Sequence, residues 1–218
     1  MAEIFGYPIM GGGGTGATLT VTGVAGSTVT VSKNGKSYTR TLDSNGKAIF
    51  KGLSSGTWTV TMTDGTHTAT TTVVVTAEYE TTVLYMQYLY NAGQTFLEVT
   101  GEWVADENSR PGVFATDKIQ MYGQNNLATT LKTSKQIDMT GFNVLEVDVN
   151  VISTVNNYSA LTVVVSNQGS EVARSDTTGL GQQQVLIDVS SVNAGAVLLY
   201  VGGYDQYKSD ISAILLRS

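Results

Sequence analysis

Strict alternation of apolar and polar residues is the clearest pattern in the first half of the chain. In the segment 57–62, Trp58, Val60 and Met62 alternate with three threonines. A period of two is that of a β-strand whose two faces meet different surroundings. The segment is therefore predicted to be a strand with an apolar inner face and a threonine-coated outer face.

Turn signals separate this strand from its neighbours. Asn34-Gly35, Asn45-Gly46 and Asp64-Gly65 each stand between two such segments. These dipeptides favour tight turns because their residues tolerate a positive φ. The spacing predicts seven strands, near residues 17–22, 28–33, 36–42, 47–53, 56–63, 66–76 and 79–86. Seven short strands separated by turn signals are typical of a small β-sandwich of the immunoglobulin-like kind.

The second half of the chain repeats the β pattern with longer loops. Residues 144–152 alternate, with Leu145, Val147, Val149 and Val151 on one face. Further apolar runs lie at 161–165, 185–189, 197–201 and 211–216, between loops rich in Gly, Asn, Ser and Gln. No segment has the period of a long amphipathic helix. The pattern predicts a second all-β domain, built from two sheets packed face to face.

Charge is distributed unevenly along the 218 residues. Residues 1–88 carry five basic and five acidic side chains, whereas the rest of the chain carries seven basic and thirteen acidic ones. Such a step predicts a domain boundary near residues 86–94. We therefore expect an all-β protein with a short flexible segment at 1–16, a first β-sandwich at 17–88 and a second at 89–218.

Composition also limits the classes of partner. The net charge of −6 argues against nucleic acid, which requires a basic surface. No apolar run is long enough to span a bilayer, so no membrane insertion is expected. The chain has no cysteine and therefore no disulfide scaffold. Its start lacks the basic and apolar regions of a secretory signal, so no leader is expected there.

The first domain carries a motif of a known family. The run 46–60, GKAIFKGLSSGTWTV, resembles the core of prealbumin-like repeats, found in carboxypeptidase regulatory-like and surface-adhesin domains. The resemblance implies that Phe50, Leu53, Trp58 and Val60 fill the core. It also implies a spacer rather than a site of chemistry.

The second domain resembles another family by the order of its segments. QIDMTGFNVLEVDV at 136–149, VVVSNQG at 163–169, VLIDVSSV at 185–192, AVLLYVGG at 196–203 and ISAILL at 211–216 follow one another as in galactose-binding-like jelly-roll modules. The resemblance implies a jelly-roll β-sandwich that binds carbohydrate.

The whole chain resembles tail or fibre-type virion proteins of bacteriophages. This resemblance implies a non-enzymatic virion protein whose first domain is a spacer and whose second domain binds a host-surface glycan. It also implies other virion proteins as partners and a homo-oligomer. Two alternatives remain open. One is a bacterial cell-surface adhesin or a carbohydrate-binding accessory module, and the other is a structural capsid or tail decoration without a ligand.

The N-terminal segment is the predicted contact with the particle. Ile4, Phe5, Tyr7 and Ile9 are apolar and precede a run of glycines at 11–14, which would act as a flexible linker. One interpretation is a hook that docks on the virion. The other is a tail without a role.

Catalytic residue types are scarce. A nucleophile activated by histidine needs that histidine beside a nucleophile and an acid, and zinc needs several His or Cys ligands. The single histidine, His67, lies among the threonines of a hairpin and is expected to be an ordinary strand residue. Paired carboxylates could hydrolyse glycosides, and the candidates are Glu98, Glu102, Asp106, Glu107, Asp148 and Asp205. Because acidic side chains at strand edges usually only face solvent, we expect no enzyme.

Aromatic residues beside polar ones are the better functional signal. Sugars bind to flat rings, while amides and carboxylates contact their hydroxyls. The loops of the second domain offer such combinations at Tyr122, at Asn157 and Tyr158, and at Tyr204, Asp205, Gln206 and Tyr207. Any single tyrosine could instead fill the edge of a core. Tyr204 and Tyr207 are the first candidates, and Trp103 is expected in the core.

One short acidic loop is a weak candidate for a metal. Asp106, Glu107 and Asn108 offer oxygen ligands of the kind that calcium prefers. The alternative is an exposed loop without an ion. We expect no cofactor, with a structural Ca²⁺ as the one open possibility.

Overall fold

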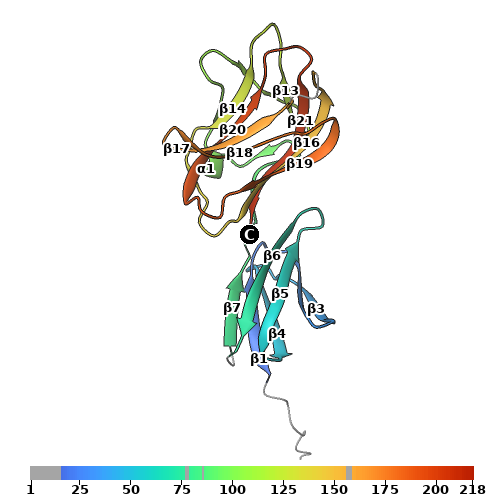
Figure 1. Cartoon of the computed structure of the whole chain (residues 1–218). Helices are drawn as coiled ribbons and strands as arrows, with labels where there is room; N and C mark the ends of the chain where they lie inside the picture. The colour runs from blue at the N-terminus through green and yellow to red at the C-terminus, as the bar shows by residue number, and fades with distance from the viewer. Residues whose placement is uncertain (1–15, 77–78, 85, 156–158) are drawn as a thin grey trace, which may run out of the picture. The chain divides into compact units, whose positions relative to one another are not determined.

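Nearly all described residues lie in β-strands or in the turns between them. The computed structural model describes residues 16–76, 79–84, 86–155 and 159–218 (Figure 1). Its chain divides into two compact units, Met1–Leu84 and Tyr85–Ser218. The all-β fold expected from the alternating patterns is confirmed. The predicted docking residues Ile4, Phe5, Tyr7 and Ile9 lie outside the described residues.

The first unit contains seven strands in two sheets. They are β1 (Ala17–Thr22), β2 (Thr28–Lys33), β3 (Lys36–Thr41), β4 (Lys47–Leu53), β5 (Gly56–Thr63), β6 (Thr68–Val75) and β7 (Tyr79–Val83). One sheet has the order β3-β2-β5-β6 and the other the order β4-β1-β7. The observed bounds agree with the seven predicted strands to within three residues at each end.

The apolar residues of the prealbumin-like motif fill the space between these sheets. Phe50, Leu53, Trp58 and Val60 are all buried. The indole Nε1–H of Trp58 donates a hydrogen bond of 2.9 Å to the carbonyl oxygen of Ser54, so the one polar atom of the ring is satisfied inside the core. The core predicted from the motif is confirmed.

Two of the predicted turns differ in geometry. Asn34 and Gly35 both have a positive φ, of 48° and 78°, as a tight two-residue turn requires. Asp64 instead begins a four-residue connection. Its carboxylate accepts hydrogen bonds of 2.9 Å from the backbone N–H groups of Thr66 and His67. His67 therefore precedes β6, and the expectation that it is a strand residue is wrong.

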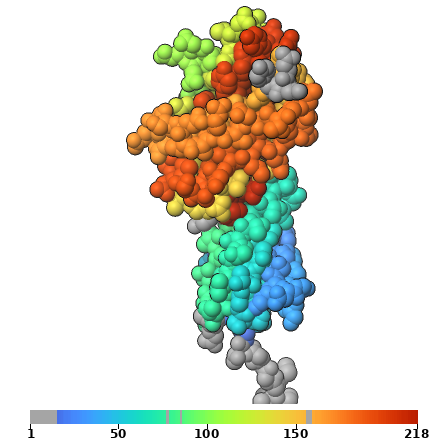
Figure 2. Space-filling view, in the orientation of Figure 1, coloured from blue at the N-terminus to red at the C-terminus, as the bar shows by residue number. Residues whose placement is uncertain are grey.

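Hydroxyl groups cover the outer face of the sheet β3-β2-β5-β6. Strand register places them in three rows: Thr41, Thr28, Thr63 and Thr68; Thr39, Thr30, Thr61 and Thr70; and Ser37, Ser32, Thr59 and Thr72. None of these twelve positions carries a charge. The predicted threonine-coated face is confirmed, and β5 and β6 make the cyan to green surface of the first unit in Figure 2.

The division between the units falls earlier than the expected boundary at 88/89. The expected boundary would cut β8 (Met86–Asn91). This strand pairs with the last strand of the chain, β21 (Lys208–Arg217), from Met86 opposite Arg217 to Asn91 opposite Ala213. Because β8 completes a sheet of the second unit, the chain divides between Leu84 and Tyr85.

The second unit adds thirteen further strands and one short helix. They are β9 (Gln94–Thr95), α1 (Leu97–Thr100), β10 (Trp103–Val104), β11 (Arg110–Pro111), β12 (Val113–Phe114), β13 (Ile119–Tyr122), β14 (Thr129–Thr133), β15 (Ile137–Asp138), β16 (Val144–Ser153), β17 (Thr162–Asn167), β18 (Ser170–Asp176), β19 (Gly181–Asp188) and β20 (Ala194–Val201), followed by β21. Among the described residues α1 is the single helix, and at four residues it is far too short to cross a bilayer.

Two antiparallel sheets form the body of this unit. The β20 sheet has the order β10-β14-β20-β17-β18, and the β21 sheet has the order β12-β13-β21-β16-β19 with β8 paired to β21. The connections β13–β14, β16–β17, β18–β19 and β20–β21 each pass from one sheet to the other. The alternating residues Leu145, Val147, Val149 and Val151 are buried between the sheets, as predicted. Trp103 packs against the same core.

Aspartates end two of the strands in the same way. The carboxylate of Asp138 accepts the N–H of Thr140 at 2.9 Å. That of Asp188 accepts the hydroxyl and the N–H of Ser190, at 2.7 and 2.9 Å. These hydrogen bonds favour the ionised form and lower the pKa of both carboxyl groups below the ordinary value.

Replacing Trp58 tests the core of the first unit. Because the side chain is buried, Trp58→Ala should lower the free energy of unfolding of this unit by about 3–5 kcal/mol. Thr70→Ala, on the exposed outer face, is the control and should change it by less than about 0.5 kcal/mol. Guanidinium titration followed by circular dichroism measures both. Equal effects of the two substitutions would contradict the assignment of faces.

Acidification tests the two aspartate turns. A carboxyl group whose pKa is lowered by folding stabilises the fold above its unfolded pKa, and this stabilisation is lost as the pH falls through the folded pKa. The double variant Asp138→Ala, Asp188→Ala should therefore melt below the wild type at pH 7, and the difference should shrink near pH 2. Melting temperatures at several pH values measure it. A difference that stays constant down to pH 2 would show that ionisation of these groups does not matter.

Candidate functional site

Two loops meet at one end of the second unit. Residues 202–207 connect β20 to β21, and residues 123–128 connect the neighbouring strands β13 and β14. A Cβ atom added to Gly123 would lie 2.0 Å from the carbonyl oxygen of Gly202, and one on Gly203 would lie 2.6 Å from the carbonyl carbon of Asn126. Glycine thus permits the close approach of the two loop backbones.

Polar contacts hold the two loops in place. Asn125 and Asn126 both adopt a left-handed backbone, with φ of 55° and 60°. The N–H of Asn125 donates a hydrogen bond of 2.7 Å to the carboxylate of Asp205. The hydroxyl of Ser153 donates to the carbonyl oxygen of Gln206 at 2.5 Å. The carboxylate of Asp205 is therefore engaged in shaping the loop, and Gln206 takes part through its backbone oxygen. The predicted sugar contacts of both side chains stay predictions.

The predicted pair of tyrosines divides into an anchor and an exposed ring. Tyr207 is 8% exposed and belongs to the core of the unit. Its backbone N–H donates to the carbonyl oxygen of Tyr204 at 3.0 Å, and its carbonyl oxygen accepts the N–H of Gly123 at 2.9 Å. Tyr204 is 63% exposed, and its ring centroid lies 5.9 Å from that of Tyr207. The buried ring thus supports the exposed one.

A groove of about 480 Å³ opens beside Tyr204 on the outer face of the β20 sheet. Strand register places Tyr200, Thr162 and Asp176 next to one another across β20, β17 and β18. All three line the groove, together with Arg174. Tyr200 is 42% exposed, so two tyrosine rings face the same space.

Charged groups in the groove neutralise one another. One guanidinium nitrogen of Arg174 lies 3.5 Å from a carboxylate oxygen of Asp176, and a second lies 4.0 Å from one of Glu171. The hydroxyl of Thr162 donates to the same oxygen of Asp176. The groove therefore offers rings, a hydroxyl, a carboxylate and a guanidinium, with little net charge.

Sequence reasoning missed four of these groove residues, namely Tyr200, Thr162, Arg174 and Asp176. One signal was available, since the alternation of the run 197–201 leaves Tyr200 on the outer face. No local pattern reveals that β17 and β18 pair beside it, because strand pairing joins distant segments.

Tyr122 lies on the other side of the 202–207 loop. Together with Asp205 and Lys208 it lines a smaller cavity of about 250 Å³. Its hydroxyl donates to the carboxylate of Asp210 at 2.7 Å, and the ammonium group of Lys118 lies 2.6 Å from the other oxygen. Burial and then this hydrogen bond raise the pKa of Tyr122, and the bond to Asp210 raises that of Lys118. The phenol therefore belongs to a partly buried polar network.

Five predicted residues remain, of which the structure describes three. Asn157 and Tyr158 lie outside the described residues. Asp106, Glu107 and Asn108 form an exposed turn between β10 and β11. The turn is closed by the backbone oxygen of Asp106, which accepts two hydrogen bonds from Ser109. Calcium binding there stays a prediction.

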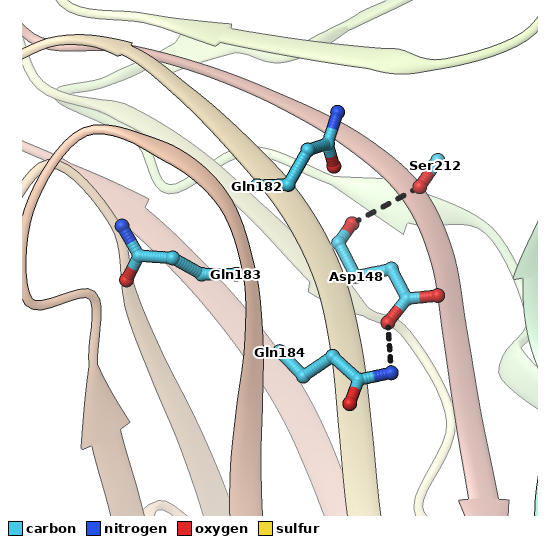
Figure 3. A pocket seen from close by; sticks show the side chains of 5 residues that line it. All are labelled: Asp148, Gln182, Gln183, Gln184 and Ser212. Carbon is cyan, nitrogen blue, oxygen red and sulfur yellow. Dashed lines mark hydrogen bonds between the residues drawn. The ribbon is translucent and has the colours of Figure 1, made fainter.

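A second polar groove lies on the outer face of the β21 sheet and measures about 470 Å³. Figure 3 shows the amide of Gln184 reaching the carboxylate of Asp148, at 3.2 Å, and the hydroxyl of Ser212 near the backbone oxygen of the same residue. Gln182 and Gln183 complete the lining. None of these five lining residues, all of them described, is aromatic. The groove thus lacks the rings that distinguish the groove at Tyr204.

Comparison with known proteins gives no family. No family model and no curated protein matches the chain. Similar solved structures include the low-affinity xylan binding module CBM86 from Roseburia intestinalis, 12% identical, with a TM-score of 0.38 over 62% of this chain and 95% of that one. Carbohydrate-binding modules of the β-sandwich superfamily are 9% identical, with a TM-score of 0.31 over 86% and 83%.

An enzyme is also among the similar structures. The secreted serine protease VesC from Vibrio cholerae is 11% identical, with a TM-score of 0.40 over 92% of this chain but only 43% of that one. Structural neighbours of this chain thus include carbohydrate-binding β-sandwiches. At such low TM-scores the likeness carries no argument about function, which has to come from the groove itself.

Replacing the two loop tyrosines separates anchor from exposed ring. Tyr207→Ala should lower the free energy of unfolding of the second unit by about 3 kcal/mol or more, because it empties a buried site. Tyr204→Ala should change it by less than about 0.5 kcal/mol. Guanidinium titration of both variants measures this. Similar losses for both would place Tyr204 in the core as well.

Proposed function

We propose that the second unit binds carbohydrate in the groove between Tyr204 and Tyr200. One observation carries the proposal. Two exposed phenol rings converge with a guanidinium, a carboxylate and a hydroxyl in one open groove. Rings that stack on the apolar face of a pyranose, beside groups that bind its hydroxyls, are the chemistry a sugar site requires.

The charges of the groove favour a neutral sugar. Among the described residues of its lining, Arg174 is the one cationic side chain, and the carboxylates of Asp176 and Glu171 already lie beside it. An acidic sugar would therefore meet at least as much negative as positive charge. A neutral hexose would meet no such electrostatic repulsion. Its hydroxyls could accept hydrogen bonds from the guanidinium and donate them to the carboxylate.

The proposed groove binds a sugar without converting it. Hydrolysis of a glycoside usually needs two carboxyl groups on either side of the bond. Among the described residues that line the groove, Asp176 is the single acid. The groove is also open along the sheet rather than enclosed, which suits a chain of sugars held at the surface.

The setting proposed for this binding is a bacteriophage particle, with the glycan on the host surface. The sequence resemblance to tail and fibre proteins supports it. A mass-spectrometric inventory of purified particles tests it, and absence of the chain from them would favour the bacterial adhesin or accessory module instead. A structural decoration protein would be found in particles but would bind no glycan.

Ring removal tests the sugar site. On an array of neutral oligosaccharides the wild type should bind at least one ligand, and Tyr204→Ala and Tyr200→Ala should each weaken that binding about tenfold, about 1.4 kcal/mol. The melting temperature should not change. The control is Tyr79→Ala, a still more exposed ring in the first unit, which should bind as the wild type does. Binding that survives both groove substitutions would refute the proposed site.

A further inference from the structure

The basic side chains of the first unit gather on two edge strands. Of its five Lys and Arg residues, Lys36 and Arg40 lie in β3, and Lys47 and Lys51 lie in β4. β3 pairs only with β2, and β4 pairs only with β1, so each is the edge of its sheet. The fifth, Lys33, has its ammonium group hydrogen-bonded to the backbone oxygen of Ser55. Four cations therefore share one side of the unit.

Two adjoining grooves run between β3 and β4. One, of about 580 Å³, is lined by Lys47 and Asp43, and the other, of about 300 Å³, by Tyr38 and Lys51. Arg40 lines both grooves, as does Thr39. Together they form a continuous edge groove along the two strands.

The edge groove carries an excess of positive charge. Arg40, Lys47 and Lys51 line it against a single carboxylate, Asp43. One oxygen of that carboxylate accepts two backbone N–H groups, at 2.8 and 2.9 Å. Within the described part of the chain, none of the three cations forms an ion pair. In the second unit, by contrast, Lys118 and Arg217 are paired with carboxylates.

An aromatic ring accompanies the cations. Tyr38 is 46% exposed, and its ring centroid lies 6.1 Å from that of Trp58, which holds it at the rim of the core. Ser37 and Thr39 also line this groove, but their hydroxyls belong to the outer face of the sheet β3-β2-β5-β6. Basic residues on edge strands also hinder pairing between copies of a sheet. That role does not require an exposed ring.

From this combination we infer that the edge groove binds an anionic polysaccharide. Carboxylate or similar groups on successive sugars would meet Arg40, Lys47 and Lys51, and a sugar ring would stack on Tyr38. The charge distinguishes this site from the groove at Tyr204, which suits a neutral sugar. The inference does not depend on the proposed function of the second unit.

Polygalacturonate, which carries a carboxylate on every sugar, is the probe. The full-length Tyr204→Ala variant is used, so that the groove of the second unit does not contribute. It should bind immobilised polygalacturonate at low ionic strength and not neutral dextran. Binding should disappear near 1 M salt, where the Debye length is about 3 Å. Failure to bind polygalacturonate would overturn the inference and leave the proposed function untouched.

Matched substitutions locate the binding. Lys47→Gln with Lys51→Gln should weaken it at least fivefold, whereas Lys132→Gln with Lys135→Gln, which removes the same charge from the second unit, should not. Equal losses of binding for the two double variants would show that the overall charge of the protein attracts the polysaccharide, which contradicts a localised site. Tyr38→Ala should also weaken binding to polygalacturonate. Polyglutamate bound as tightly as polygalacturonate would show that the groove reads charge alone, and this too would overturn the inference.

Discussion

The candidate sugar site depends on the burial of one ring, that of Tyr207. The loop after β20 has to cross from one sheet to the other, and the ring beneath it fixes that crossing to the core. A Cβ atom on Gly202 would lie 3.2 Å from this ring, so the backbone rests directly on it. With the loop held from below, Tyr204 can stay exposed without losing its position. Preorganisation of this kind reduces the entropy lost on binding.

Charge distinguishes the surfaces of the two units more than fold does. Both are β-sandwiches built mainly from antiparallel strands. In the second unit, carboxylates lie beside Lys118, Arg174 and Arg217. In its ring-lined groove, the charge of Arg174 is offset by that of Asp176. In the first unit the cations along β3 and β4 have no such partners among the described residues. Two β-domains of similar construction are thus suited to different classes of carbohydrate.

Much of this architecture could be predicted because it depends on local patterns. The period of two in the sequence predicted the inward faces of β5 and β16, and the dipeptide Asn34-Gly35 predicted the turn between β2 and β3. The exposed ring of Tyr204 followed from its place in a polar loop. The groove around Tyr204 could not be predicted in this way, because Arg174 and Asp176 come close to Tyr204 only through pairing between strands far apart in sequence. The division at Leu84 was also missed, since pairing of β8 with β21 has no local signal.

Carbon-13 NMR of ring-labelled tyrosine, recorded while a neutral oligosaccharide found on the array is added, tests the central claim most directly. Each tyrosine ring gives its own signal, assigned by substitution. The account predicts that the signals of Tyr200 and Tyr204 move with the sugar concentration, that the signal of Tyr207 broadens little, and that the signal of Tyr79 stays fixed. Unmoved signals from both groove rings, with the sugar bound, would contradict it.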